Sequence, residues 1–121
     1  MPSGKLAAQV AHASVAVFLN KGTWSVVEGE DTFTISNVSP AMKHWMDVSF
    51  PKAVLGIDTE MDIEILYAEA QRAGLPCSKI IDSGRTVYNG VHNLTCIAIG
   101  PAERSEIDQI TGHLPLYKDM V

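Results

Sequence analysis

The sequence lacks the features that mark a membrane or a secreted protein. None of its apolar runs reaches the roughly 20 residues that a membrane-spanning helix needs. Its first residues do not form a basic segment followed by an apolar segment, as in a secretory signal peptide. The only two cysteines are Cys77, beside an apolar run, and Cys96, within one, which is typical of small packed side chains with free thiols. We therefore expect a cytoplasmic protein with no membrane partner.

Positive charge is also scarce. The chain has 9 Lys and Arg residues against 14 Asp and Glu residues, so its net charge is −5. A broad nucleic-acid surface needs clustered Lys and Arg, and the composition argues against one. A small basic patch on an acidic body is still compatible with this balance. Its candidate members are Lys5, Lys52, Lys79 and Arg85.

Several common site motifs are missing as well. Gly84 and Gly100 are isolated, so neither of the usual glycine-rich phosphate loops is present. The four histidines have no metal-ligand spacing with the cysteines or with one another. We expect neither a metal nor a cofactor.

The apolar pattern that is present predicts one α/β domain covering residues 1–121. The hydrophobic share is 46%, enough for a sizeable core, and the length fits a single domain. The expected helices are 4–20, 40–47, 58–74 and 103–110, and the expected strands are 53–57, 78–81 and 94–99. A hairpin is expected to join residues 24–27 to 32–35, and residues 113–117 are expected to form a tail that docks on the body of the domain.

Two of these elements carry specific structural expectations. The unbroken apolar run at residues 53–57 indicates a strand buried on both faces, which would form a right-handed βαβ unit with residues 78–81. The short helix after Pro40 is expected to carry Met42, Trp45 and Met46 into the core.

Three stretches hold candidate functional side chains. Lys5, Gln9 and His12 are spaced i, i+4, i+7 and share one helix face, which is compatible with a solvated surface or with a site. The loop at residues 82–86 follows a buried strand, where it could carry ligand chemistry or form a simple turn. Thr95 lies within a strongly apolar strand, so its hydroxyl group needs a partner.

Motifs in these stretches resemble those of the second-class (archaeal and eukaryotic type) peptidyl-tRNA hydrolases. Residues 4–13 (GKLAAQVAHA) resemble the signature helix of that family, and residues 51–55 (PKAVL) its second strand. Residues 82–86 (DSGRT) are similar to its D-x-G-[RK]-T loop. The closing strand, G-P turn and T-G-H-L ending correspond to 95–101 (TCIAIGP) and 110–114 (ITGHL). The blocks follow the family order, with only about residues 22–39 lacking a counterpart.

The resemblance implies a fold, an activity and a set of site residues. The family folds as a three-layer α-β-α sandwich around a small mixed β-sheet, is often a homodimer, and hydrolyses the ester of peptidyl-tRNA without a metal, which recycles tRNA for translation. The implied catalytic residues are Lys5, Asp82 and Thr95, and the implied supporting or substrate-binding residues are Gln9, His12, Arg85 and Thr86.

The implied residues are chemically suited to ester hydrolysis. The reaction needs a positioned water and stabilisation of the developing oxyanion. We expect Asp82 to orient the water, while Lys5 stabilises negative charge and keeps Asp82 ionised. An ionised carboxylate held in this way is a weak base, which favours orientation of the water over full proton abstraction. Thr95 would position the water or the substrate carbonyl, and His12 could relay a proton.

Three departures from the family pattern leave alternatives open: a missing strand, the unusual region at residues 22–39, and the net charge of −5 together with Pro115 in the tail. The family strand that ends in a basic-x-Asp-Leu segment has no counterpart ahead of Gly4. A sheet without this strand would have an unpaired edge or a gap, so we expect either a true start that lies upstream or another segment in the place of the strand. One alternative is a non-catalytic homologue of the same fold that binds RNA or a protein. Another is a small α/β regulatory or dimerisation module, which would show no salt-dependent tRNA binding.

Overall fold

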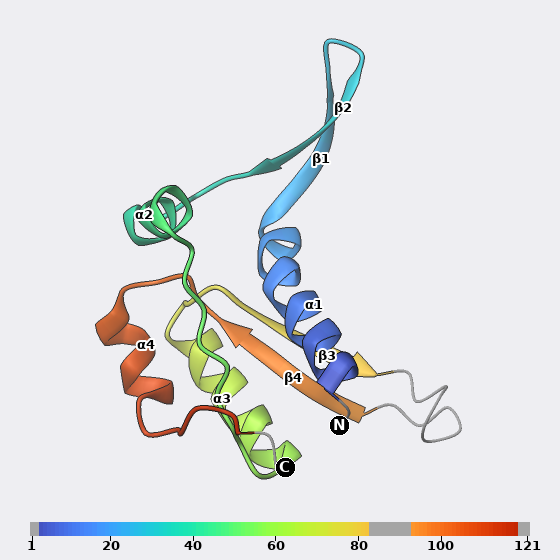
Figure 1. Ribbon diagram of the computed structural model, residues 1–121. Helices are drawn as coiled ribbons and strands as arrows, with labels where there is room; N and C mark the ends of the chain where they lie inside the picture. The colour runs from blue at the N-terminus through green and yellow to red at the C-terminus, as the bar shows by residue number, and fades with distance from the viewer. Residues whose placement is uncertain (1–2, 83–92, 119–121) are drawn as a thin grey trace.

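The body of the molecule is a two-stranded sheet between helices. The computed structural model describes residues 3–82 and 93–118. Helix α1 (Ser3–Lys21) lies on one face of the sheet, and helix α3 (Glu60–Arg72) lies on the other beside helix α4 (Arg104–Thr111) (Figure 1). This arrangement confirms a small α/β fold with helices on both sides of the strands.

The sheet itself pairs strand β3 (Cys77–Asp82) with strand β4 (Asn93–Ile99). Their register is antiparallel, with Cys77 opposite Ile99 and Asp82 opposite Asn93. Both strands lie where the sequence predicts them. The pairing differs from the mixed sheet implied by the resemblance, because both sheets formed by the described residues are antiparallel.

The predicted strand at residues 53–57 is wrong. Within this segment only Leu55 forms a β-bridge, with Leu116 of the C-terminal tail. Gly56 N donates to Pro115 O at 2.9 Å, and Tyr117 N donates to Val54 O at 2.8 Å. The apolar run therefore holds the predicted docked tail rather than adding a strand beside β3 or β4, and the predicted βαβ unit is absent from the described part of the chain.

Two helix starts are capped by the side chains that directly precede them. Ser39 Oγ accepts from Met42 N at 3.1 Å at the start of α2 (Pro40–Val48), and Thr59 Oγ1 accepts from Asp62 N at 3.1 Å at the start of α3. Such caps satisfy amide groups that have no partner within the helix.

Helix α2 buries less than its sequence suggests. Met42 is fully buried, as predicted, and Trp45 is half-buried, with its ring stacked on Phe18 of α1 at 5.9 Å. The prediction for Met46 is wrong, because this side chain is exposed. The helix covers too little of its neighbours for all three side chains to point inward.

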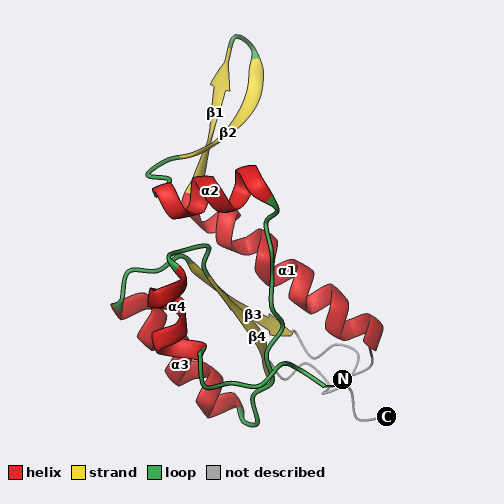
Figure 2. Cartoon of the chain, turned by 60° about the vertical axis from the view of Figure 1, so that its left-hand side comes forward, coloured by secondary structure: helices red, strands yellow, loops and turns green. Residues whose placement is uncertain are grey.

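Strands β1 (Gly22–Val27) and β2 (Glu30–Ile35) form the predicted hairpin. Glu28 and Gly29 make its two-residue turn with φ values of 51° and 82°, the positive values that a type I′ turn requires. The hairpin stands away from the body and is joined to it through α1 (Figure 2).

The buried core lies between α3, α4 and the sheet. Its centre consists of Leu66, Ala70, Leu75 and Ile110, with Ile97 and Ile99 of β4 packed against it. No helix in the described ranges is long and apolar enough to cross a membrane.

Candidate active site

Two side chains of the sheet fix helix α1 in place. Ser78 of β3 is fully buried, and its Oγ donates to the backbone oxygen of Ala13 at 2.6 Å. Cys96 of β4 approaches the backbone oxygen of Gln9 with its Sγ at 3.3 Å. These two contacts set the register of α1 along the strands.

This register brings the predicted catalytic residues to one end of the sheet. From Ala13 back to Lys5 the helix covers about 12 Å. From Ser78 forward to Asp82 the strand covers about 13 Å. The first turn of α1 lies beside the end of β3 and the start of β4 (Figure 1). Lys5, Asp82 and Thr95 therefore come from three different elements that meet at the same end of the fold.

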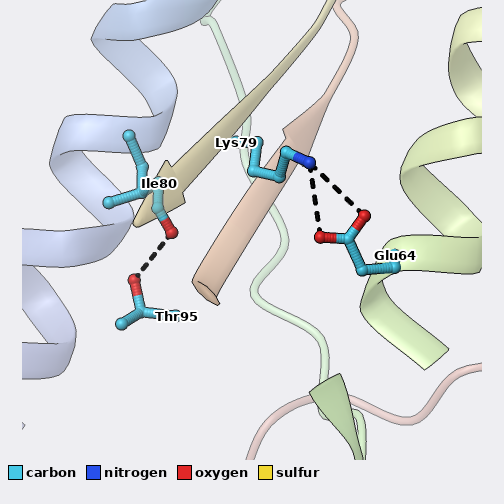
Figure 3. A network of polar contacts seen from close by, with 4 residues as sticks. All are labelled: Glu64, Lys79, Ile80 and Thr95. Atoms are coloured by element: carbon cyan, nitrogen blue, oxygen red, sulfur yellow. Dashed lines mark hydrogen bonds and ion pairs between the residues drawn. The ribbon is translucent and has the colours of Figure 1, made fainter. Parts of the chain in front are cut away.

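Thr95 has a defined hydrogen bond in this region. Its Oγ1 donates to the backbone oxygen of Ile80 across the two strands at 3.2 Å (Figure 3). The hydroxyl proton is thus directed at the backbone, as expected for a half-buried threonine in a strand. The oxygen keeps its acceptor lone pairs, so a water or another donor could bind to it.

The side chains predicted for the site differ in their exposure to solvent. Lys5 and Gln9 are half-buried, whereas His12 is exposed. Asp82 is the last residue of β3. Arg85 and Thr86 lie outside the described residues.

Lys79 does not join Lys5 in a common basic patch. Ser78 points toward α1, so the next residue along the strand points to the opposite face. There Lys79 Nζ lies 3.3 Å from both carboxylate oxygens of Glu64 and 5.0 Å from the ring centre of Tyr67, both on α3 (Figure 3). The ion pair with Glu64 and the contact with the Tyr67 ring hold α3 against the sheet.

Lys52 also makes local contacts instead of joining Lys5. Its Nζ donates to the backbone oxygen of Phe50 at 3.0 Å and lies over the rings of Phe50 and Trp45, at 5.0 and 5.4 Å. The four-residue basic patch considered from the sequence is therefore wrong for Lys52 and Lys79, which serve local packing.

The two cysteines do not have the properties of nucleophiles. Both are free and half-buried. Burial raises the pKa of the Cys77 thiol and of the Cys96 thiol, so both are mainly neutral at neutral pH. Cys77 packs against the core, which agrees with the sequence-based expectation of a small hydrophobic side chain.

One hollow in the described part of the chain lies away from these residues. It is lined by the last turn of α1, by Tyr67 and Gln71 of α3, and by Cys77 at the start of β3. Cys77 and Asp82 are at opposite ends of the same strand. No group of three His, Cys, Asp or Glu side chains that could hold a metal occurs among the described residues.

Sequence reasoning did not identify Ser78 as important. The available signal was a serine close to the apolar residues of a strand, where a buried hydroxyl group must find a partner. We predict that Ser78→Ala lowers the free energy of unfolding by about 1 kcal/mol, because the fully buried donor to Ala13 is lost.

Urea denaturation measures this effect. The matched control is Ser25→Ala on the exposed hairpin strand, which should change stability by less than about 0.5 kcal/mol. Equal denaturation midpoints for Ser78→Ala and the unmodified chain would show that the bond does not hold α1 in place.

Comparison with known proteins identifies the family. The family model described as "Peptidyl-tRNA hydrolase PTH2" matches residues 1–117. A peptidyl-tRNA hydrolase of Haloquadratum walsbyi is 40% identical over 117 residues, which are 97% of this chain and 89% of that protein. The enzymes of Halobacterium salinarum and Methanocaldococcus jannaschii are 38% and 34% identical, covering 97% and 96% of this chain and 89% of each relative. This chain belongs to the PTH2 family of peptidyl-tRNA hydrolases.

Proposed function

We propose that this chain hydrolyses the ester bond of peptidyl-tRNA and releases the peptide and free tRNA. Membership of the PTH2 family and the names of its archaeal relatives support this activity, and nothing in these comparisons favours a non-catalytic homologue. The structural observation that carries the proposal is the register of α1, which brings Lys5 to the end of the sheet where β3 ends and β4 begins.

The proposed chemistry divides the work among three residues. Asp82 orients a water for attack on the ester carbonyl, and Lys5 stabilises the negative charge that develops on the carbonyl oxygen. Thr95 Oγ1 gives its own proton to Ile80 O, so its role is to accept a hydrogen bond from that water. A fixed cation and a fixed acceptor of this kind need no reorganisation as the transition state forms.

The remaining site residues are proposed to bind substrate. Gln9 and His12 follow Lys5 along α1, and Gln9 is half-buried while His12 is exposed. An exposed imidazole on this face can contact the tRNA or relay a proton to the leaving ribose oxygen. Arg85 and Thr86 are proposed to contact the substrate from the loop that follows Asp82.

Several finer properties belong to the same proposal. The enzyme would act without a metal, because Lys5 supplies the positive charge that a metal would otherwise bring to the carbonyl oxygen. It would recycle tRNA for translation in the cytoplasm. It would act as a homodimer.

An assay with purified protein and peptidyl-tRNA carrying a labelled peptide tests this proposal. We expect peptide release that is unchanged by EDTA. Lys5→Ala protein prepared in the same way controls for contaminating hydrolases. Loss of release in EDTA with recovery on adding Mg²⁺ or Zn²⁺ would overturn metal independence alone.

The same preparation separates the proposal from the two alternatives. Salt-dependent tRNA binding without peptide release would favour a non-catalytic homologue. Absence of both binding and release would favour an unrelated regulatory module.

A further inference from the structure

Helix α1 is tied to the sheet by two hydrogen bonds to neighbouring turns of its backbone. Ser78 Oγ donates to Ala13 O at 2.6 Å, and Cys96 Sγ donates to Gln9 O at 3.3 Å. Gln9 and Ala13 are four residues apart, so the two acceptor oxygens are separated by about 6 Å along the helix axis. The donors come from β3 and β4, so both strands of the sheet hold the same helix.

The two donors have a matching separation on the sheet. Cys96 is opposite Ile80, and Ile80 is two residues beyond Ser78 on β3. Two residues of a strand cover about 7 Å, close to the separation of the two acceptors. Both bonds form together at one register only, because a shift of one residue moves the helix by about 1.5 Å and turns it by about 100°.

These bonds are additional to the hydrogen bonds that form the helix. In an α-helix each carbonyl oxygen accepts from the amide group four residues later, and it has a second lone pair for another donor. Ser78 and Cys96 are the second donors to Ala13 O and Gln9 O. Removal of either donor would therefore leave the bonds inside α1 intact and would change how the helix is held on the sheet.

Other contacts restrain α1 in a different way. Ala13 and Val17 are buried, but apolar packing is not directional. The Phe18 ring stacks on Trp45 of α2 at 5.9 Å, which restrains the last turns of the helix. The bonds from the sheet instead give a directional restraint toward the first turn, which carries Lys5.

We propose that Ser78 and Cys96 are positioning residues, which hold α1 at the register where Lys5 reaches the ester of the substrate. This inference rests on the proposed function. Gln9 O and Ala13 O are one and two turns from Lys5, or about 6 and 12 Å along the axis. Ser78 is fully buried and acts through Lys5 rather than on the substrate. Displacing a catalytic group by about 1 Å can cost up to about 100-fold in rate.

Steady-state kinetics of Ser78→Ala test the inference. We expect kcat to fall about tenfold while KM stays within about twofold, because Lys5 stabilises charge that develops only in the transition state. The rates are measured well below the unfolding transition of every variant. An unchanged kcat would overturn the role of Ser78.

Ser14→Ala is the matched control on the same helix. Ser14 Oγ donates to Val10 O at 3.1 Å, so this bond also joins a hydroxyl group to the backbone of α1. Both of its ends lie within α1, and its loss does not free the helix from the sheet. We expect an unchanged kcat, and equal losses in Ser14→Ala and Ser78→Ala would overturn the inference.

Two variants of Cys96 test the second bond independently of Ser78. Cys96→Ala removes the donor to Gln9 O and should lower kcat several-fold. Cys96→Ser keeps a donor at the same place and should retain most of the unmodified rate. Equal kcat values for these two variants would overturn the role of Cys96.

A double variant tests whether Ser78 acts through Lys5. In a Lys5→Ala background, Ser78→Ala should slow the residual hydrolysis by less than about twofold, because the group that it positions is already absent. Single-turnover reactions with enzyme in excess measure these slow rates. A full tenfold loss in the Lys5→Ala background would show that Ser78 acts by another route and would overturn the inference.

The outcomes also separate this inference from the proposed function. Peptide release by the unmodified chain, with normal kcat in both Ser78→Ala and Cys96→Ala, would overturn the positioning roles alone. Absence of release by the unmodified chain would overturn both.

Discussion

Replacing Lys5 by alanine is expected to slow peptidyl-tRNA hydrolysis by roughly 10²–10⁴, the usual range for one positioned catalytic group. Lys5 is half-buried in the first turn of α1, at the end of the sheet where β3 stops at Asp82. Removing its ammonium group removes the proposed stabilisation of the developing oxyanion. Single-turnover rates at saturating enzyme measure the chemical step directly.

Asp82→Ala is expected to cause a loss of similar size, because the attacking water is no longer oriented. The two effects should not add fully in the double variant, since both residues act on the same transition state. Lys43→Ala is the matched control: Lys43 is an exposed lysine of α2 whose Nζ lies 2.6 Å from Asp47. If Lys5→Ala and Asp82→Ala both fold and cleave at the unmodified rate, the assignment is wrong.

Local features of the fold were predictable because their chemistry is local. Ser39 and Thr59 cap the helices that follow them, since a hydroxyl group and the amide it caps lie within three residues. The turn at Glu28 and Gly29 sits between the two β-rich runs that the sequence pairs. Each of these elements is decided within a few residues of chain.

The segment at residues 53–57 was not predictable by the same means. A short apolar run is compatible with a buried strand, but its partner is chosen by the rest of the fold. Here the partner is the tail at Pro115 and Leu116, more than 50 residues away, and a single bridge forms instead of a ladder. Sequence periodicity contains no information about such a long-range contact.

The candidate site was predictable only in part. The family motifs identify Lys5, Asp82 and Thr95 separately, and the presence of each residue could also have a purely structural reason. The buried contacts from Ser78 and Cys96 to the backbone of α1 bring their elements together, and no motif includes that information. The separation of Lys79 from Lys5 likewise follows from the alternation of strand faces once α1 and α3 are placed.

The second large effect is expected in the core. Leu66 of α3 is 8% exposed and packs with Ala70, Leu75 and Ile110, which join α3, α4 and the sheet. Leu66→Ala should lower the free energy of unfolding by about 2–5 kcal/mol, because the removed methyl groups leave a cavity that the surroundings fill only partly. A loss of this size lowers the melting temperature by roughly 8–20 °C in a domain of this length.

Ile65→Ala provides the matched control one position along the same helix. Ile65 is 48% exposed, so its loss should cost less than about 1 kcal/mol. Chemical denaturation of both variants gives the comparison, and equal losses would mean that the core does not lie between α3, α4 and the sheet. Because α3 and α1 lie on opposite faces of the sheet, Leu66→Ala should retain the hydrolysis rate of the unmodified chain at temperatures where it remains folded. A catalytic defect in the folded Leu66→Ala variant would show instead that packing on the α3 face sets the geometry of the site.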